Sequence, residues 1–406
     1  MALKIAITKE TRANEKRVAA SPETVKKLTA MGCTVTIEKN AGALSHFSDS
    51  DYKEAGATIA NDYSSTVKNA DIVLCVQASD DLDLSPLKKN AVLVGIYNPY
   101  NNKVFIEKCA KANVTAFSME LIPRISRAQS MDVLSSQSNL AGYKAVLDAT
   151  EFYNRAMPMM MTAAGSIAPA KVFIMGAGVA GLQAIATARR LGAIVSATDV
   201  RPAAKEQVQS LGASFVAVEN DEFKEAENAG GYAKEMSKDY QKQQAKLVEE
   251  TIAKQDIVIT TALIPGRPAP KLITTKMVES MKAGSVIVDM AVEAGGNVEP
   301  SKANEVADVN GVKVIGYENM ASRLSTDASA LYAKNLLNLL SLIIKESDLN
   351  IDWEDEIVQG ITLTKEGAVI HPNFADKKTP AKKTTKKTTK KTVKKSATKK
   401  SVKKEA

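Results

Sequence analysis

Between Leu3 and Phe117, short apolar runs alternate with longer stretches of helical spacing. The runs predict β-strands and the stretches predict helices. The expected strands are Lys4 to Thr8, Thr34 to Glu38, Ile72 to Val76, Ala91 to Ile96 and Val114 to Ala116. The expected helices include Ser21 to Met31, which opens on a Ser-Pro pair, and Asn102 to Ala112. Such alternation is typical of a mostly parallel sheet with helices on both faces.

A second series of apolar runs follows the proline-free stretch Ile125 to Phe152, which predicts one long connecting helix. The methionine-rich segment Met157 to Met161 predicts a turn that serves as core or packing surface rather than as a cofactor site. The strands expected next are Lys171 to Met175, Ile194 to Thr198, Ser214 to Val218, Asp256 to Thr260, Ser285 to Asp289 and Lys313 to Ile315. A final helix from about Thr326 to Lys345 and a strand-like run at residues 361–363 complete the pattern.

These elements predict an α/β chain with two doubly wound parallel-sheet domains. We assign residues 1–135 and 346–376 to the first domain and residues 136–345 to the second, so that the last segment returns and a cleft lies between the domains. Residues 377–406 repeat lysine pairs among threonine, serine and alanine, with too little apolar surface to fold. We therefore predict a disordered Lys-rich tail.

The lysine tail changes the meaning of the net charge. The chain carries a formal charge of +8, but the tail alone holds fourteen lysines and one glutamate, so the rest is acidic. Three widely spaced cysteines, Cys33, Cys75 and Cys109, indicate a reducing compartment, and two histidines without a neighbouring cysteine predict no metal. The start lacks the apolar run of a secretory signal, and the apolar segment Ala328 to Ile344 is too short and too polar to span a bilayer.

The strongest chemical motif is a glycine-rich loop between a strand and a helix. Residues 171–175 lead directly into Gly176, Ala177, Gly178, Val179, Ala180 and Gly181, and an Ala- and Leu-rich helix follows. In a Rossmann-type domain the first glycine makes a tight turn, the second admits the pyrophosphate, and the third lets the helix pack on the strand. The helix N-terminus then holds the phosphates of a nucleotide in the cleft. The alternative is that the glycines serve packing alone.

Asp199 ends the next expected strand, eighteen residues after Gly181. A dinucleotide-binding fold places there the acid that accepts hydrogen bonds from the adenosine ribose. A carboxylate at this position repels a 2′-phosphate and favours NAD, whereas the nearby Arg201 is able to accommodate that phosphate. We predict that the nucleotide is NAD(H).

Two further segments are polar and lie near the expected cleft. Residues 123–132 carry arginines, a glutamine and an aspartate, and they either reach the nicotinamide or form an ordinary solvated helix start. Residues 220–236 form a long polar insertion with Gly230-Gly231-Tyr232. Long insertions in compact domains are often functional or flexible, and this one is a candidate lid.

Taken in order, these motifs resemble the NAD(H)-binding component of proton-translocating nicotinamide nucleotide transhydrogenases, over about residues 1–374. The segments that carry the resemblance are Lys9-Glu10-Thr11, Glu15-Lys16-Arg17-Val18-Ala19, residues 124–139, the glycine loop through Asp199-Val200-Arg201, Gly230-Gly231-Tyr232-Ala233, and Val288-Asp289-Met290-Ala291-Val292-Glu293 with Gly295-Gly296-Asn297. The resemblance implies Si/Re-specific hydride transfer from NADH bound here to NADP⁺ on a partner subunit, coupled to proton movement through membrane-spanning subunits. It also implies a cytoplasmic homodimer attached peripherally to the inner membrane through those partners.

The same resemblance implies roles for individual residues. Arg124, Gln129 and Asp132 are expected to be catalytic and, with Ser135, to grip the nicotinamide and its ribose. Tyr232 is expected on a mobile loop that closes over the cofactor. The other expected cofactor contacts are Gly176, Ala177, Gly178, Val179, Ala180, Gly181, Asp199, Val200, Arg201, Thr261, Ala262 and Leu263.

Alanine dehydrogenase shares this fold and is the main alternative. Making or breaking a C–N bond requires a lysine and a histidine near the nicotinamide for substrate binding and proton transfer. The matching strand ends read Leu74-Cys75-Val76-Gln77 and Gly95-Ile96-Tyr97-Asn98, with neither residue type. Direct hydride transfer between two nicotinamides needs no proton at the carbon, so the sequence favours transhydrogenation.

An alternative of another class is a polyanion-binding protein that acts through the Lys-rich tail, since such a tail releases counterions from any polyanion. The tail has no aromatic residue and no base-reading motif, so we predict no specific nucleic-acid partner. Electrostatic contact of the tail with an anionic membrane is at least as good an interpretation as nonspecific polyanion binding, and a tail that is simply solvated is the default.

Overall fold

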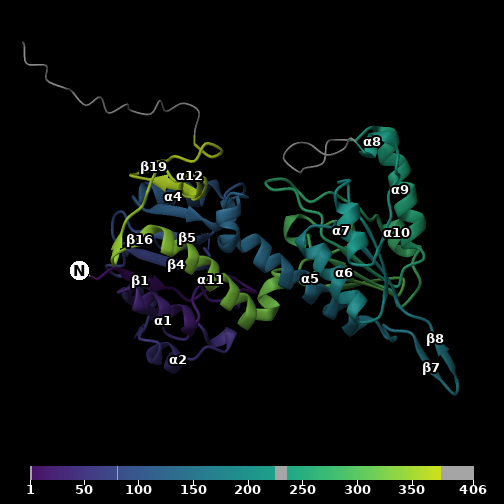
Figure 1. Ribbon diagram of the computed structural model, residues 1–406, viewed down its shortest axis with the longest axis horizontal. Helices are drawn as coiled ribbons and strands as arrows, with labels where there is room; N and C mark the ends of the chain where they lie inside the picture. The colour runs from purple at the N-terminus through teal and green to yellow at the C-terminus, as the bar shows by residue number, and fades with distance from the viewer. Residues whose placement is uncertain (1, 80, 225–235, 376–406) are drawn as a thin grey trace, which may run out of the picture.

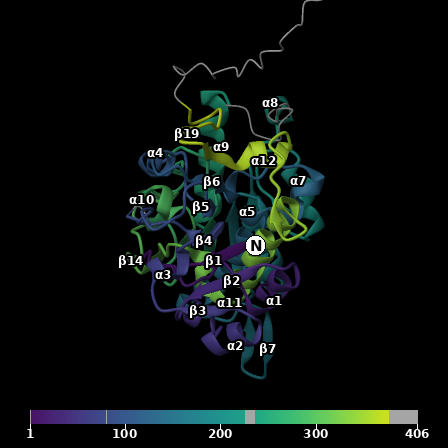
Figure 2. The ribbon, with the colours of Figure 1, turned by 90° about the vertical axis from the view of Figure 1, so that its left-hand side faces the viewer.

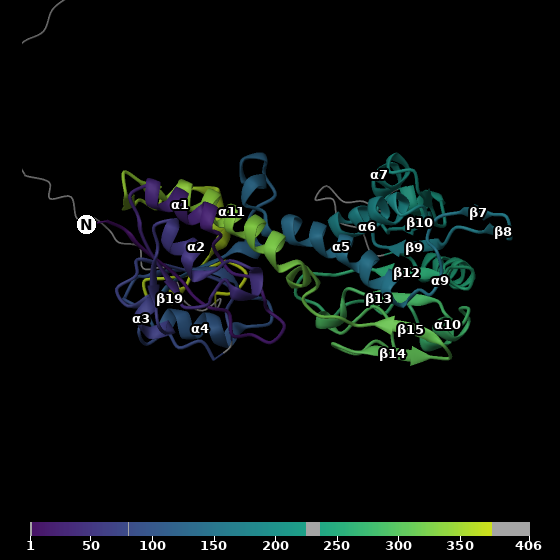
Figure 3. The ribbon, with the colours of Figure 1, turned by 90° about the horizontal axis from the view of Figure 1, so that it is seen from below.

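Two α/β domains joined by a pair of long helices make up the protein (Figure 1). The computed structural model describes residues 2–79, 81–224 and 236–375. The joining helices are α5 (Val133–Phe152) and α11 (Ser325–Ile343), which contact each other as they run between the domains (Figure 3). Tyr232 and the Lys-rich tail lie outside the described residues.

The first domain is built on an eight-stranded sheet of order β19-β18-β6-β5-β4-β1-β2-β3. Its strands are β1 (Lys4–Ile7), β2 (Thr34–Glu38), β3 (Thr58–Ala60), β4 (Ile72–Gln77), β5 (Val92–Ile96), β6 (Thr115–Ser118), β18 (Thr362–Lys365) and β19 (Ala368–Val369). The strands from β6 to β3 are parallel, and β18 returns antiparallel to β6 from the end of the chain.

Helices cover both faces of this first sheet, as the end-on view in Figure 2 shows. The helices α1 (Pro22–Ala30) and α2 (Asp49–Glu54) pack with α11 on one face, and α3 (Tyr63–Val67) and α4 (Lys103–Lys111) pack on the other. The short helix α12 (Glu356–Ile361) leads into β18. The expected parallel sheet with two covered faces is therefore confirmed.

The second domain has a seven-stranded sheet of order β11-β10-β9-β12-β13-β15-β14. Its strands are β9 (Lys171–Met175), β10 (Ile194–Thr198), β11 (Ser214–Phe215), β12 (Ile257–Thr260), β13 (Val286–Asp289), β14 (Val306–Val309) and β15 (Val312–Ile315), and its helices are α6 (Val179–Arg190), α7 (Ala204–Ser210), α8 (Asp221–Lys224), α9 (Lys238–Ile252) and α10 (Thr275–Glu279). Only β14 pairs antiparallel within this sheet. The order reverses at β9, because β10 lies on one side of it and β12 on the other, and such a switch point is where open α/β sheets bind ligands.

Each joining helix belongs mainly to one core. Side chains of β9 alternate between two clusters: Val172 and Ile174 pack with α5 and α6, while Phe173 and Met175 pack with α9 and α10. The leucines of α11 instead join the first domain's core. Among the described residues, no helix has the length and apolar character needed to cross a membrane.

Two sequence expectations need correction. The connecting helix begins at Val133 rather than at Ile125, because residues 126–131 form a 3-10 helix and the Asp132 carboxylate caps α5 by accepting from the Ser135 amide at 2.9 Å. The methionine-rich turn is instead the start of a hairpin, β7 (Met160–Thr162) with β8 (Gly165–Ile167), that extends from the second domain (Figure 1). Met157 is buried, but Met161 is 79 % exposed and contributes nothing to the core.

Candidate functional site

The glycine loop joins β9 to α6, and its three glycines have different surroundings. Gly176 has a φ of +107°, and a Cβ there would lie 2.4 Å from Thr261 Oγ1. A Cβ on Gly181 would lie 1.8 Å from the carbonyl oxygen of Gly176. Gly178 has an ordinary φ of −75°, and a Cβ there would meet nothing within 4 Å. Packing therefore explains Gly176 and Gly181, but it does not explain why Gly178 is a glycine.

Asp199 follows β10 and is tied to the glycine loop. Its Oδ2 accepts from the Ala177 amide at 2.7 Å and from Arg201 Nη2 at 3.0 Å. Its Oδ1 accepts from the Arg201 amide at 2.8 Å and from Arg201 Nε at 2.9 Å. The side chain is only 7 % exposed, whereas the next residue, Val200, is 55 % exposed. The carboxylate therefore lies beside the N-terminus of α6, and it forms an ion pair with Arg201.

The residues after β12 lie on the opposite side of β9 from Asp199. The Thr261 amide donates to the Met175 carbonyl at 2.9 Å, and its hydroxyl donates to the Gly176 carbonyl at 3.1 Å. Leu263 is 57 % exposed. The structure thus brings Thr261 and Asp199 to the same glycine loop, one from each side of the switch point.

The polar segment of residues 123–135 lies where the first domain meets α5. Arg124 and Gln129 are exposed. Arg127 holds the segment through two hydrogen bonds to Asp355 at 2.8 and 2.9 Å, and the Ser130 carbonyl accepts from two asparagines of α11. Asp132 and Ser135 bond to each other at the first turn of α5.

Helix α5 also sets the distance from this segment to the glycine loop. A Cβ on Gly142 would lie 2.0 Å from the Ala180 carbonyl oxygen, so α5 contacts the first turn of α6 there. Asp132 precedes Gly142 by roughly 15 Å along the helix at ~1.5 Å per residue. A ligand that touches both Asp132 and the glycine loop must therefore be extended, as a dinucleotide is.

The strand ends compared with alanine dehydrogenase carry Cys75 and Tyr97, and both are buried. Burial raises the pKa of the Cys75 thiol and of the Tyr97 hydroxyl well above their ordinary values, so both stay protonated near neutral pH. Within the ranges that the structure describes, no three His, Cys, Asp or Glu side chains gather as a set of metal ligands.

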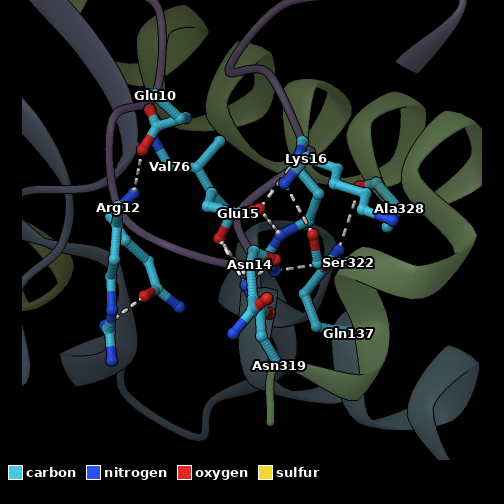
Figure 4. A network of polar contacts seen from close by, with 12 residues as sticks. Glu10, Arg12, Asn14, Glu15, Lys16, Val76, Gln137, Asn319, Ser322 and Ala328 are labelled. Carbon is cyan, nitrogen blue, oxygen red and sulfur yellow. Dashed lines mark hydrogen bonds and ion pairs between the residues drawn. The ribbon is translucent and has the colours of Figure 1, made fainter. Parts of the chain in front are cut away.

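A buried polar network beside α5 was not predicted from the sequence (Figure 4). Arg17 binds Glu15 through two hydrogen bonds of 2.8 and 2.6 Å and reaches Gln137 of α5 at 2.8 Å and Asn319 at 3.2 Å. The Lys16 amide donates to Ser322 Oγ at 2.7 Å. The loop after β1 is therefore bonded to α5 and to the segment that leads into α11. The resemblance had singled out residues 15–19 without giving them a role.

Glu10 lies in the same loop, and its carboxylate accepts from the amides of Val76 and Gln77 at 2.7 and 3.0 Å. Glu10 as a whole is half-buried, but its carboxyl group is enclosed by the protein. Burial, reinforced by the nearby Glu15 charge, raises the pKa of Glu10 from its ordinary 4.5 to about 8. Burial also opposes ionisation of Glu15, but the Arg17 charge and hydrogen bonds outweigh it and lower the Glu15 pKa.

The free energy of unfolding should fall as the pH rises, because folding favours the protonated form of Glu10. Its pKa is raised in the folded state, so its contribution is complete below about pH 4.5 and is lost as the pH rises through about 8. The slope from this one group is at most about 1.4 kcal/mol per pH unit. Urea unfolding at pH 5 to 8 should show a smaller loss of stability in Glu10→Gln than in the wild type, while the exposed Glu54→Gln control keeps the wild-type slope. Equal slopes in all three proteins would show that Glu10 is ionised throughout.

Comparisons with known proteins match most of the described residues. Residues 6–141 match the family model "Alanine dehydrogenase/PNT, N-terminal domain", and residues 145–372 match "Alanine dehydrogenase/PNT, C-terminal domain". A Rhodospirillum rubrum protein, the first of the parts that make up the NAD(P) transhydrogenase subunit alpha there, is 52 % identical over 377 residues, which cover 91 % of this chain and 98 % of the relative.

The comparisons also separate the two predicted activities. The crystal structure of a transhydrogenase from Sinorhizobium meliloti is 53 % identical, with a TM-score of 0.82, over 90 % of this chain and all of that one. Alanine dehydrogenase 1 of Staphylococcus aureus is 30 % identical over 88 % of this chain and 92 % of its own length. The prediction of a transhydrogenase rather than an alanine dehydrogenase is therefore confirmed, and the chain belongs to the alanine dehydrogenase/PNT family as a member of its transhydrogenase alpha-subunit group.

Proposed function

We propose that the chain binds NADH across the carboxyl ends of β9 and β12 and passes its hydride to NADP⁺ held by a partner subunit. The observation that carries the proposal is the open space at Gly178, where a side chain would meet no protein atom. A glycine that packing does not require, at the first turn of a helix, lets a phosphate approach the backbone closely. The N–H groups of the first turn of α6 then hold the pyrophosphate.

The two ends of the nucleotide fall on opposite sides of β9. We place the adenosine ribose at Asp199, with Val200 and Arg201 beside it, since this carboxylate already lies against the glycine loop. Arg201 is held in an ion pair with Asp199, and a 2′-phosphate would have to break that pair. Both features favour NADH over NADPH.

The nicotinamide end lies toward the first domain in this proposal. Thr261, Ala262 and Leu263 follow β12, and Arg124, Gln129, Asp132 and Ser135 lie at the start of α5. The roles of these residues, and that of Tyr232 outside the described ranges, rest on the resemblance. The domain bounds 1–135 with 346–376, and 136–345, remain a proposal as well.

Hydride transfer of this kind needs positioning more than acid–base chemistry. Two electrons and one hydrogen nucleus leave the dihydronicotinamide carbon of NADH and join the corresponding carbon of NADP⁺, so no proton is taken up or released there. The reaction therefore requires no proton transfer by Cys75 or Tyr97, whose side chains stay protonated. The two carbons must approach to within about 3–3.5 Å, so the nicotinamide end must be accessible to the partner's nucleotide.

The partner subunits belong to the proposal too. The name of the Rhodospirillum rubrum relative describes it as one portion of a subunit alpha, which implies further subunits in that protein. We propose that this chain likewise joins an NADP(H)-binding domain and membrane-spanning subunits at the inner membrane, in a proton-translocating, Si/Re-specific enzyme. A homodimer is supported by the β7–β8 hairpin, which leaves Met160, Met161 and Ile167 at least 38 % exposed, because a second copy would cover this apolar surface.

Reconstitution tests the function directly. Alone, the chain should bind NADH more tightly than NADPH and oxidise neither. Mixed with an NADP⁺-binding transhydrogenase domain, it should move deuterium from labelled NADH into NADPH without loss to solvent. Gln129→Ala should slow this transfer more than about 10-fold while changing NADH affinity less than about 3-fold, because a residue that sets geometry acts on the transition state.

The matched control is Gln209→Ala, which alters an exposed glutamine of α7 and should transfer at the wild-type rate. Absence of transfer in the mixture, or a label that washes out into water, would overturn the proposed reaction. Equal affinities for NADH and NADPH would overturn only the proposed role of Asp199 and would leave the proposed reaction intact.

A further inference from the structure

Asn297 is a fully buried amide behind the loop that follows β12. Its Oδ1 accepts from the Ala262 amide at 3.1 Å. Its Nδ2 donates to the Ala262 carbonyl at 2.9 Å and to the Pro270 carbonyl at 2.8 Å. One side chain thus holds both ends of the segment from Ala262 to Pro270, which we call the β12 loop.

The position of Asn297 is itself fixed by its neighbours. Its amide donates to Asp289 Oδ1 at 3.1 Å, and its carbonyl accepts from Leu272 and Ile273 at 2.8 and 3.1 Å. Asp289 is also fully buried and accepts from the amides of Ala291 and Val298. Because all polar groups of Asn297 are used, the residue has one orientation, and an aspartate in its place would be unable to donate to the two carbonyls.

The β12 loop reaches from the glycine loop to the first domain. Immediately before the loop, the Thr261 hydroxyl donates to the Gly176 carbonyl at 3.1 Å. Further along, a Cβ on Gly266 would lie 2.8 Å from the ring of Tyr100, so the loop contacts the first domain there. Between these points Leu263 and Ile264 are 57 % and 46 % exposed. Residues with so much exposed surface are not held by packing, so the hydrogen bonds at the loop's ends set its course.

We infer that Asn297 is a positioning residue that fixes the β12 loop as the nicotinamide-side wall of the nucleotide site. The inference rests on the proposed function. Asp199 and Ala177 hold the adenosine end on the other side of β9 and share no hydrogen bond with Asn297 among those of the described residues. Losing the Asn297 contacts should therefore weaken binding of the nicotinamide half and spare the adenosine half.

The test compares two ligands that differ in that half. Asn297→Asp keeps the size and the acceptor oxygen but loses both donated bonds, and Asn297→Ala loses all three without adding a charge. In calorimetric titrations of the full chain, both variants should bind NADH at least about 10-fold more weakly than the wild type and bind ADP within about 2-fold of it. The control Asn304→Asp, at an exposed position in the same domain, should bind both ligands as the wild type does.

Hydrogen exchange gives a second readout that is independent of ligand. The Ala262 amide should be protected in the wild type and lose that protection in both variants, while the Ile259 amide inside β12 keeps it. If neither variant folds, Lys271→Met tests the inference, since Lys271 is exposed and its Nζ donates to the Gly295 carbonyl at 2.6 Å between the same two segments. It should weaken NADH binding about 3-fold and leave ADP binding unchanged.

Wild-type NADH affinity in a folded Asn297 variant, or equal weakening of NADH and ADP, would overturn the inference while leaving the proposed function intact. A wild-type chain that binds ADP and NADH equally tightly would also overturn it, because the wall would then contribute nothing. A wild-type chain that binds neither ligand would overturn the proposed function and this inference with it.

Discussion

The Gly178→Ala variant should fold like the wild type and bind NADH at least about 100-fold more weakly, a loss of about 2.8 kcal/mol. An added methyl group meets no protein atom within 4 Å, and the φ of −75° suits any residue. Alanine is a poorer N-cap than glycine, which costs about 0.5–1 kcal/mol and lowers the melting temperature by about 3 °C or less. The methyl group does, however, occupy the place at which a phosphate approaches the first turn of α6.

The contrasting variant is Gly181→Ala, whose methyl group would overlap the Gly176 carbonyl oxygen at 1.8 Å. Helix and strand must then separate, so this variant should lose both stability and NADH binding. Thermal unfolding and fluorescence titration, measured on both variants, separate packing from ligand contact. Wild-type affinity in Gly178→Ala would reduce the glycine loop to a packing motif and remove the main support for the nucleotide site.

The strands that the sequence predicted well are those buried on both faces. Residues 257–260 and 286–289 are buried throughout, and each begins with three consecutive β-branched apolar residues, as is typical of a central parallel strand. β3 and β14 were not predicted, because they are short edge strands with partly exposed side chains. The β7–β8 hairpin was not predicted either, since all of its residues are exposed and no inward-facing pattern marks it.

The start of α5 shows where local signals were available but misread. Residues 126–131 are helical, though as a 3-10 helix, and their composition resembles that of the helix that follows. The capping pattern of Asp132 with Ser135 three residues later marked the true boundary. The absence of proline excludes a proline break in this stretch, but it does not exclude a change from a 3-10 helix to an α-helix.

The parts of the candidate site that could be predicted are local in sequence. The glycine loop and Asp199 lie on consecutive strands, so a motif places them together, and the structure adds the bond from Ala177 to Asp199. Arg17 finds its partners 120 and 302 residues away, at Gln137 and Asn319. No pattern along the chain connects these positions, because the burial that makes them interact exists only after the two domains and α5 have assembled.

Arg17→Met should lower the free energy of unfolding by about 3–5 kcal/mol, because it leaves the Glu15 carboxylate buried without its cation. The two side chains are 3 % and 0 % exposed, so water cannot replace the lost partner. Methionine preserves most of the volume, and the loss therefore reports on charge and hydrogen bonding rather than on a cavity. Urea unfolding followed by circular dichroism at pH 7 gives the difference.

The matched control is Lys27→Met, which breaks an ion pair with Glu23 whose side chains are 48 % and 66 % exposed. Exposed pairs of this kind contribute about 0–1 kcal/mol, so the control should stay close to the wild type. The double variant Glu15→Gln, Arg17→Met should recover some of the lost stability, since no unpaired charge remains buried. If Arg17→Met lowered the free energy of unfolding no more than Lys27→Met does, the network between the first domain and α5 would contribute no more than a surface ion pair. The packing of α5 and α11 would then have to hold the two domains together.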